Sequence, residues 1–154
     1  MKYLITFACA VLIVITVSAQ TKIYDGHHTN YSSCLYTIKG DEIYSGNATN
    51  YSDCLFTIKD NKVYQGNSTN YSNCLFTIKG DKIYRGHQTS YSNVLYTIRD
   101  GKIYSGNSTN YSDCLFTIKD NKVYRGNSTN YSNLLVTIDG VYKYAILAVL
   151  VGPH

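Results

Sequence analysis

The chain repeats itself every 20 residues. Six copies run from Ile23 to Gly140, and the third, which begins at Val63, reads VYQGNSTNYSNCLFTIKGDK. A period this short describes one small structural unit that cannot bury its apolar face alone and must pack on copies of itself. Like groups at even intervals also weigh against an enzyme, because catalysis needs unlike groups that converge on one point.

Each copy predicts two β-strands. In the third copy a short β-prone run begins at Val63 and ends at Gly66, and a longer one extends from Tyr71 to Lys79. The residues between the two runs are Asn, Ser and Thr, which favour turns. Apolar residues follow a spacing of two rather than 3.6, so no helix is expected in the repeats.

The substitutions between copies indicate the core. Cys, Val and Leu interchange at one position, Tyr, Phe and Val interchange two residues later, and Ile follows two residues after that in every copy. Strand side chains alternate between faces, so these three positions share one face. We therefore expect a continuous hydrophobic core made of the Cys/Val/Leu, aromatic and Ile positions.

Two all-β architectures fit this repeat. In a β-solenoid each copy is one coil, and its two short strands stack in parallel on those of the next coil, about 4.8 Å away. In an antiparallel array each copy contributes to β-hairpins, which the turn pairs Asp60-Asn61 and Asp100-Gly101 favour. The near-identity of the copies favours stacking, because ladders reward sameness. We expect the solenoid, with the hairpin array as the alternative.

The two ends of the chain differ from the repeats. Residues 1–19 combine a basic start, an apolar run and small residues before Gln20, which predicts a signal peptide cleaved after Ala19 and a secreted or cell-surface protein. The repeat domain is expected over residues 20–140. Residues 141–154 begin with the apolar stretch VYKYAILAVLV, too short to span a bilayer, and are expected to cap the repeats or dock a subunit.

No residue pattern predicts catalysis, a cofactor or a metal site. The cysteines of the repeats, Cys34, Cys54, Cys74 and Cys114, share one repeat position and are interpreted as small buried hydrophobes without disulfides. No CxxC motif or paired His spacing suggests zinc. His27, His28 and His87 are interpreted as exposed turn residues.

Two further features are interpreted conservatively. Nine Asn-x-Ser/Thr sequons occur, four pairs of them three residues apart, and their Asn, Ser and Thr are read as turn formers rather than glycan acceptors. The net charge of +4 is spread evenly over the repeats, so no nucleic-acid partner is expected.

Two columns of tyrosine are the candidate ligand-binding residues. One column comprises Tyr24, Tyr44, Tyr64, Tyr84, Tyr104 and Tyr124, and the other Tyr31, Tyr51, Tyr71, Tyr91, Tyr111 and Tyr131. Partly exposed Tyr beside Asn, Ser and Thr is suited to stacking on sugar rings or gripping a protein. The alternative is structural, because Tyr also covers the second face of a thin sheet.

The aromatic-Gly spacing in IYSG and IYRG, with a strand-turn-strand unit, resembles secreted bacterial short tandem β-repeat proteins. The copies look like the repeats of curli-type fibre subunits and, more distantly, choline-binding or MORN-type hairpin repeats. The curli resemblance implies stacked β-solenoids that assemble into extracellular fibres. The chain lacks the Trp pairs that form choline cages.

Three functions are therefore considered. The first is a non-catalytic secreted or cell-surface protein in adhesion or in extracellular matrix and fibre formation, with end-to-end self-assembly. The second is a module that binds extracellular glycans or matrix proteins through the tyrosines. The third is ice binding, prompted by the Thr columns that begin at Thr29 and Thr37. No transmembrane span is expected in the processed chain.

Overall fold

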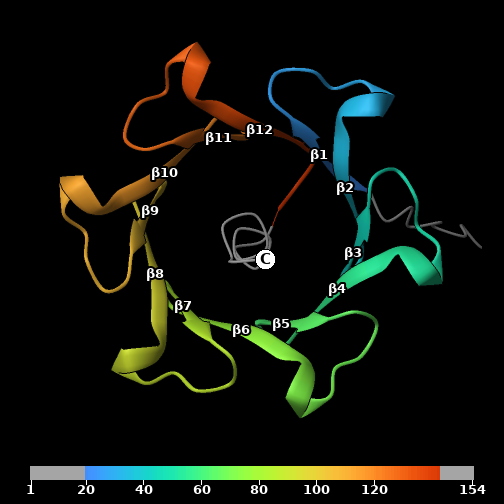
Figure 1. The fold of residues 1–154 in the computed structure, drawn as a ribbon, viewed down its shortest axis with the longest axis horizontal. Coiled ribbons are helices and arrows are strands. Elements are labelled where there is room, and N and C mark those ends of the chain that lie inside the picture. The colour runs from blue at the N-terminus through green and yellow to red at the C-terminus, as the bar shows by residue number, and fades with distance from the viewer. Residues whose placement is uncertain (1–19, 143–154) are drawn as a thin grey trace, which may run out of the picture.

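The computed structural model describes residues 20–142. Twelve strands form one closed barrel in which each strand pairs with its neighbours in sequence and the last strand pairs with the first (Figure 1). The strands are β1 (Thr21–Asp25), β2 (Cys34–Lys39), β3 (Glu42–Ser45), β4 (Cys54–Lys59), β5 (Lys62–Gln65), β6 (Cys74–Lys79), β7 (Lys82–Arg85), β8 (Val94–Arg99), β9 (Lys102–Ser105), β10 (Cys114–Lys119), β11 (Lys122–Arg125) and β12 (Leu134–Asp139). Short 3-10 helices precede the longer strands: η1 (Tyr31–Ser33), η2 (Tyr51–Asp53), η3 (Tyr71–Asn73), η4 (Tyr91–Asn93), η5 (Tyr111–Asp113) and η6 (Tyr131–Asn133).

All pairings between adjacent strands are antiparallel, so the predicted solenoid is wrong and the hairpin alternative fits. The reason lies in the two-residue turns. Asp60 and Asn61 both have positive φ, at 52° and 57°, as do Asp120 and Asn121. Such turns match the twist of an antiparallel pair, whereas parallel strands need a long crossover.

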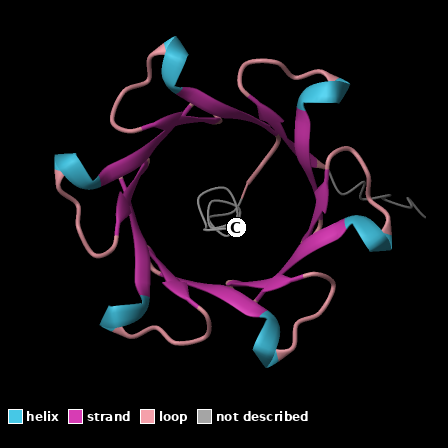
Figure 2. Ribbon diagram, viewed as in Figure 1, coloured by secondary structure: helices cyan, strands magenta, loops and turns pink. Residues whose placement is uncertain are grey.

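A β-bulge in every repeat curves the sheet into a ring. On β3 and β4, Ile43 lies opposite Phe56 and Tyr44 lies opposite Cys54, so Leu55 is the extra residue. The same shift occurs where β1 meets β2 and where β11 meets β12. A bulge bends and twists a strand, and six equal bends close the sheet without a free edge. Figure 2 shows the strands as a ring from which loops and 3-10 helices project outward. We call each such loop together with its 3-10 helix a petal, for example residues 46–53.

The hydrophobic core lines the inside of the barrel. Its buried residues are Ile23, Ile38, Ile43, Ile58, Val63, Phe76, Ile83, Ile98, Ile103, Val123 and Ile138. The Ile position and the aromatic position were both predicted to face the core, and both are confirmed. Partly buried aromatic side chains such as Phe56 and Tyr96 pack against this cluster.

The cysteines do not belong to this inner core, contrary to expectation. Cys34 Sγ lies 3.4 Å from the carbonyl oxygen of Gly46 and 3.8 Å from Thr37 Oγ1, both on the outer side of the sheet. The bulge explains the error, because one extra residue at Leu35 reverses the alternation between Cys34 and Tyr36. The cysteines thus help to form a second, outer layer between the sheet and the petals.

Residues 1–19 and 143–154 lie outside the described part of the chain. The predicted signal peptide and nearly all of the predicted apolar cap fall there. Of the latter, Val141 and Tyr142 are described. The carbonyl oxygen of Val141 accepts a hydrogen bond from Thr21 Oγ1 at 2.6 Å, and Tyr142 packs against the inner core.

Candidate functional site

Each petal begins at a glycine that is fixed to the barrel at two points. Gly46 has a φ of 58°, which favours glycine. Its N–H donates to the carbonyl of Leu35 at 2.8 Å, and its own carbonyl accepts from Thr37 Oγ1 at 2.7 Å. The Thr-to-Gly bond recurs in all six repeats, and Thr137 closes the set by donating to Gly26. The petals are therefore anchored alike.

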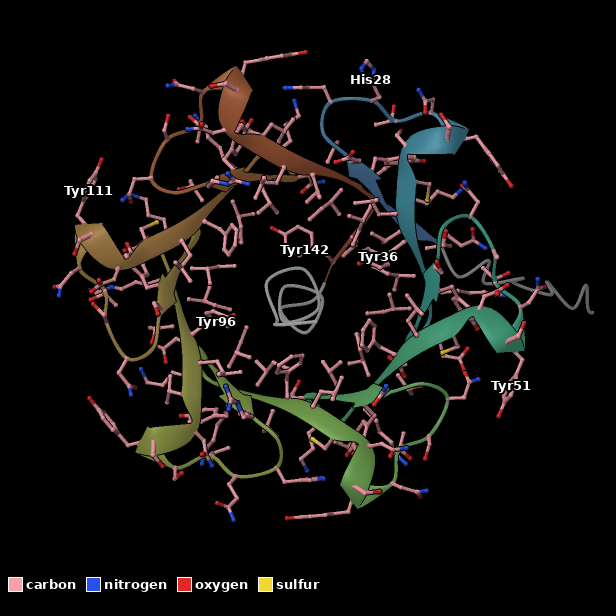
Figure 3. All side chains as sticks on the ribbon, in the orientation of Figure 1. His28, Tyr36, Tyr51, Tyr96, Tyr111 and Tyr142 are labelled. Carbon is pink, nitrogen blue, oxygen red and sulfur yellow. The ribbon has the colours of Figure 1, made fainter. Side chains whose placement is uncertain are left out.

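The second tyrosine column stands on the petals and faces water. These side chains, at the first position of each 3-10 helix, are between 73% and 81% exposed. In Figure 3 the labelled Tyr51 and Tyr111 point away from the barrel. Six large, flat, amphipathic side chains thus project from the ring, and we call them the tyrosine ring: Tyr31, Tyr51, Tyr71, Tyr91, Tyr111 and Tyr131.

The first tyrosine column is buried and is not available to a ligand in this structure. Tyr24, Tyr44, Tyr64, Tyr84 and Tyr104 are at most 9% exposed, and Tyr124 is partly buried. Each lies on a short strand opposite a Thr of one neighbouring strand, as Tyr104 does opposite Thr97. Of the twelve predicted ligand-binding tyrosines, only the six of the tyrosine ring are exposed, whereas the first column covers the sheet.

Side chains at the position after each petal glycine join neighbouring petals. The sequence predicted only an exposed turn at this position. Asn47 Nδ2 donates to the carbonyl of Tyr31 at 2.7 Å, and Asn127 Nδ2 donates to that of Tyr111 at 2.6 Å. Equivalent bonds from Asn67 and Asn107 complete the Asn set. Each bond fixes the backbone of one member of the tyrosine ring to the next petal, so the ring is preorganised.

Two histidines take the place of Asn at opposite junctions. The Nε2 of His27 lies 3.1 Å from the carbonyl of Tyr131, and that of His87 lies 2.6 Å from the carbonyl of Tyr71, so each Nε2–H donates. Their rings also stack on these tyrosines, with centroids 3.4 Å and 3.7 Å apart. His27 thereby joins the first petal to the last. The sequence shows that the two histidines are three repeats apart, but it does not show that they join neighbouring petals.

One junction is electrostatically different from the others. Lys22 Nζ donates to Asn47 Oδ1 at 2.9 Å, and Lys102 does the same to Asn127. The equivalent residue for Asn67 is Glu42, which instead accepts from the hydroxyl of Tyr44. The buried Asn67 Oδ1 has no hydrogen-bond partner among the described residues. The hydrogen bond to Glu42 and burial together raise the pKa of Tyr44 to about 12.

Two of the four cysteines lie in surroundings that lower their reactivity. Cys34, Cys54, Cys74 and Cys114 are free thiols. Burial raises the pKa of Cys54 and of Cys74, which keeps these thiols protonated near neutral pH and makes them weak nucleophiles. Within residues 20–142, no group of three or more His, Cys, Asp or Glu side chains is placed to hold a metal ion.

The structure separates the two members of each sequon pair. Asn47 and its equivalents are used in the junctions, whereas Asn50 and its equivalents are exposed just before the 3-10 helices. In the first repeat Asn30 Oδ1 accepts from the N–H of Ser33 at 3.0 Å, as an N-cap does. The expected turn-forming role therefore fits Asn30, whereas Asn47 and its equivalents bond a neighbouring petal instead.

The described residues thus present six exposed tyrosines at equivalent positions around one ring, and His27 and His87 stack on two of them. Among the described residues, no helix has the length and apolar character that crossing a membrane requires. The ring suits contact with an extended or repetitive partner, because each petal presents an exposed Tyr at the equivalent position.

The comparisons with known proteins agree with this architecture. The family model that matches residues 23–150 is described as a 6-fold beta flower protein. No curated protein and no solved structure gives a significant match. The resemblance to short tandem β-repeat proteins is confirmed at this level, and the match covers all six repeats. The chain belongs to the 6-fold beta flower protein family.

Proposed function

We propose that this chain is a non-catalytic, secreted or cell-surface adhesion protein that binds glycans or matrix proteins through the tyrosine ring. The observation that carries the proposal is the exposure of all six ring members, between 73% and 81%. Large aromatic side chains are seldom left so exposed at equivalent positions without a partner.

The chemistry of the petals supports this kind of ligand. A tyrosine ring offers a flat apolar face to the C–H groups of a sugar, and its hydroxyl both donates and accepts hydrogen bonds. Ser and Asn lie beside it, as Ser52 and Asn50 do beside Tyr51. Tyr with Ser and Asn is also the composition of adaptable protein-binding surfaces.

Six exposed tyrosines at equivalent positions on one ring support multivalent binding. A partner that presents the same epitope repeatedly, such as a polysaccharide, can engage several petals at once. Each further contact is then intramolecular, so weak single sites add up to strong attachment. The junction bonds favour this, because they fix the positions of the sites before binding.

The test uses the four ring members on which no histidine is recorded as stacking: Tyr31, Tyr51, Tyr91 and Tyr111. Binding to immobilised chitin, cellulose, mixed β-glucan and collagen is measured for the purified wild type, for the variant with all four Tyr→Ala changes and for the four single Tyr→Ala variants. We expect the fourfold Tyr→Ala variant to lose binding by orders of magnitude, and each single Tyr→Ala variant to lose it several-fold.

Two matched controls accompany this test. The fourfold Tyr→Phe variant keeps the stacking face and should retain most binding to polysaccharide. The fourfold Ser→Ala variant at Ser32, Ser52, Ser92 and Ser112 changes the neighbouring position on the same 3-10 helices and should lose much less binding than the fourfold Tyr→Ala variant. Unchanged binding of a folded Tyr→Ala variant, on a surface that the wild type binds, would refute the role of the tyrosine ring.

Fibre formation and ice binding receive less support. Every described strand already has two partners, so growth of a fibre by strand addition has no free edge to use. Assembly would need contacts between barrel ends or petals, and electron microscopy would distinguish filaments from single rings. Of the two Thr columns, the one that begins at Thr37 lies largely beneath the petals, where its hydroxyls bond glycine carbonyls.

A further inference from the structure

The inside of the barrel presents apolar side chains over most of its length. Two circles of Ile and Val side chains line the barrel, one from the short strands, as Ile43, and one from the long strands, as Ile38. The inward aromatic position adds a third circle, which we call the inner aromatic circle: Tyr36, Phe56, Phe76, Tyr96, Phe116 and Val136. In Figure 3 the labelled Tyr36 and Tyr96 extend toward the axis. Burial raises the pKa of Tyr96, as expected for a hydroxyl removed from water.

A barrel of twelve strands is so wide that the side chains of its own strands do not fill its interior. The side chains of an eight-stranded barrel just fill its interior, and an eleven-stranded barrel has room for a helix along its axis. This barrel has twelve strands. Its axis therefore has space for additional atoms, and apolar walls favour an apolar occupant over water or a void.

The chain itself turns toward this space after the last strand. Gly140, directly after β12, has a φ of 122°, and a Cβ there would lie 2.6 Å from Thr21 Oγ1. Glycine thus lets the backbone pass close to β1, where the Thr21 hydroxyl donates to the carbonyl of Val141. Tyr142 then packs against the inner core, and Figure 3 shows it within the ring of strands.

The residues that follow Tyr142 have the composition and length that such a space would accept. Lys143 and Tyr144 precede seven uncharged apolar residues, Ala145 to Val151. Nine residues would span about 14 Å as a helix, which is within the roughly 20 Å of a six-residue strand. The family match extends to residue 150, well past the end of β12, so this segment belongs to the unit that the family shares.

We propose that the interior of the barrel is a docking site whose occupant is residues 143–151 of the same chain. The segment completes the hydrophobic core as a central plug. Its apolar side chains leave water and contact the inward-facing aromatic side chains, such as Phe56 and Tyr96. Lys143 directly follows Tyr142 in the sequence, and a side chain of this length can keep its ammonium group in water while its stem covers apolar surface. This plug lies inside the barrel, so its docking does not depend on the tyrosine ring outside.

Tryptophan fluorescence provides the first test, because the chain contains no Trp. Leu147→Trp places a reporter in the segment, and His154→Trp places a control beyond it. We expect blue-shifted emission at position 147, with several-fold weaker quenching by acrylamide than at position 154 and no dependence on protein concentration. Tyr144→Trp is a second, nearly isosteric reporter that should behave like position 147 if the larger change at Leu147 disturbs folding.

Hydrated emission at positions 147 and 144 would overturn the proposal. Shielding that disappears on dilution, together with a change from dimer to monomer, would also overturn it, because the segment would then occupy a second copy. So would a small apolar molecule retained in native mass spectrometry alongside a hydrated reporter.

Truncation provides the second test. A full-length chain is compared with one that ends after Tyr142, by thermal unfolding and by binding of an apolar fluorophore such as ANS. We expect the shortened chain to unfold at a lower temperature and to bind the fluorophore strongly. A shortened chain that unfolds at the same temperature and binds no fluorophore would refute the plug. If the shortened chain fails to fold, the Trp reporters at positions 147 and 144 still test the proposal.

Discussion

Tyr104 and Tyr111 belong to the same repeat, lie seven residues apart and serve opposite purposes. Tyr104 is 8% exposed between the sheet and a petal, whereas Tyr111 is 78% exposed on the petal itself. Their chemistry is the same, so the difference comes from the backbone. The strand holds Tyr104 against Thr97 and Cys114, and the loop carries Tyr111 outward onto a 3-10 helix. The repeat thus separates a tyrosine for stability from one for contact.

Replacing each of these tyrosines by Ala should reveal the largest contrast. Tyr104→Ala empties a buried aromatic site and should lower the free energy of unfolding by about 3 kcal/mol or more. Tyr111→Ala removes an exposed ring and should change it by less than about 0.5 kcal/mol. Urea unfolding followed by circular dichroism measures both. Equal losses in the two variants would show that the columns are not divided in this way.

The bond between Thr97 and Gly106 should matter next. Thr97 is 1% exposed, and its hydroxyl donates to the Gly106 carbonyl at 2.7 Å. Thr97→Val keeps the shape but leaves this carbonyl without the bond, at a cost of about 1–2 kcal/mol. Thr109→Val, on the exposed part of the petal, is the matched control and should be nearly neutral in the same unfolding measurement.

The petal junctions should have smaller and more local effects. Asn107→Ala removes the bond to the Tyr91 carbonyl, and we expect a loss of about 1 kcal/mol. Hydrogen exchange should accelerate in the two petals that meet there and remain unchanged on the far side of the barrel. Asn110→Ala, at an exposed position of the same petal, should leave exchange at that junction as it is. Global acceleration would contradict the view of the junction as a local tie.

The last prediction concerns Glu42, and its effect is confined to alkaline pH. With the pKa of Tyr44 at about 12, against an ordinary value of 10.0, the folded state favours the protonated hydroxyl. The stability that this contributes is complete below about pH 10 and is lost as pH rises through about 12. In Glu42→Lys, Tyr44 should ionise at lower pH, and a Lys can reach Asn67 Oδ1 as Lys22 reaches Asn47 Oδ1.

Ultraviolet absorbance of tyrosinate during alkaline titration measures the change in Tyr44. One late-ionising tyrosine should move to lower pH in Glu42→Lys, and the loss of stability above pH 10 should become less steep. Lys62→Glu creates the reverse exchange on the next short strand. If the titration of wild type and Glu42→Lys coincides, Glu42 does not hold the proton on Tyr44.

Much of this fold was predictable from the sequence. The solenoid prediction was wrong because the similarity of the copies favoured parallel stacking, whereas the two-residue turns impose antiparallel pairing. The other errors about the fold share one physical origin. Alternation correctly placed Ile38 and Phe56 toward the core, and Asp60-Asn61 correctly indicated a tight hairpin turn. The bulge at each Leu is not visible in the hydrophobic pattern, and it reversed the face assigned to Cys34. The same bulge curves the sheet, so the closed barrel was missed together with it.

The candidate site was predictable in part. The periodicity identified the tyrosines, but it could not distinguish the strand position from the loop position, because both columns repeat equally well. The junction role of His27 and Asn47 was missed for a related reason. Their partners are backbone carbonyls, such as that of Tyr31, and a carbonyl leaves no signature in a sequence.

The pairing of β1 with β12 joins the two ends of the repeat array, with Ile23 opposite Ile138. The other junctions between repeats use the same residue types, so the first strand of another molecule offers nearly the same surface to β12. Closure within one chain then prevails through proximity, with an effective concentration on the order of millimolar. At high protein concentration or during slow folding, exchange of terminal strands between molecules becomes the natural competitor of the ring.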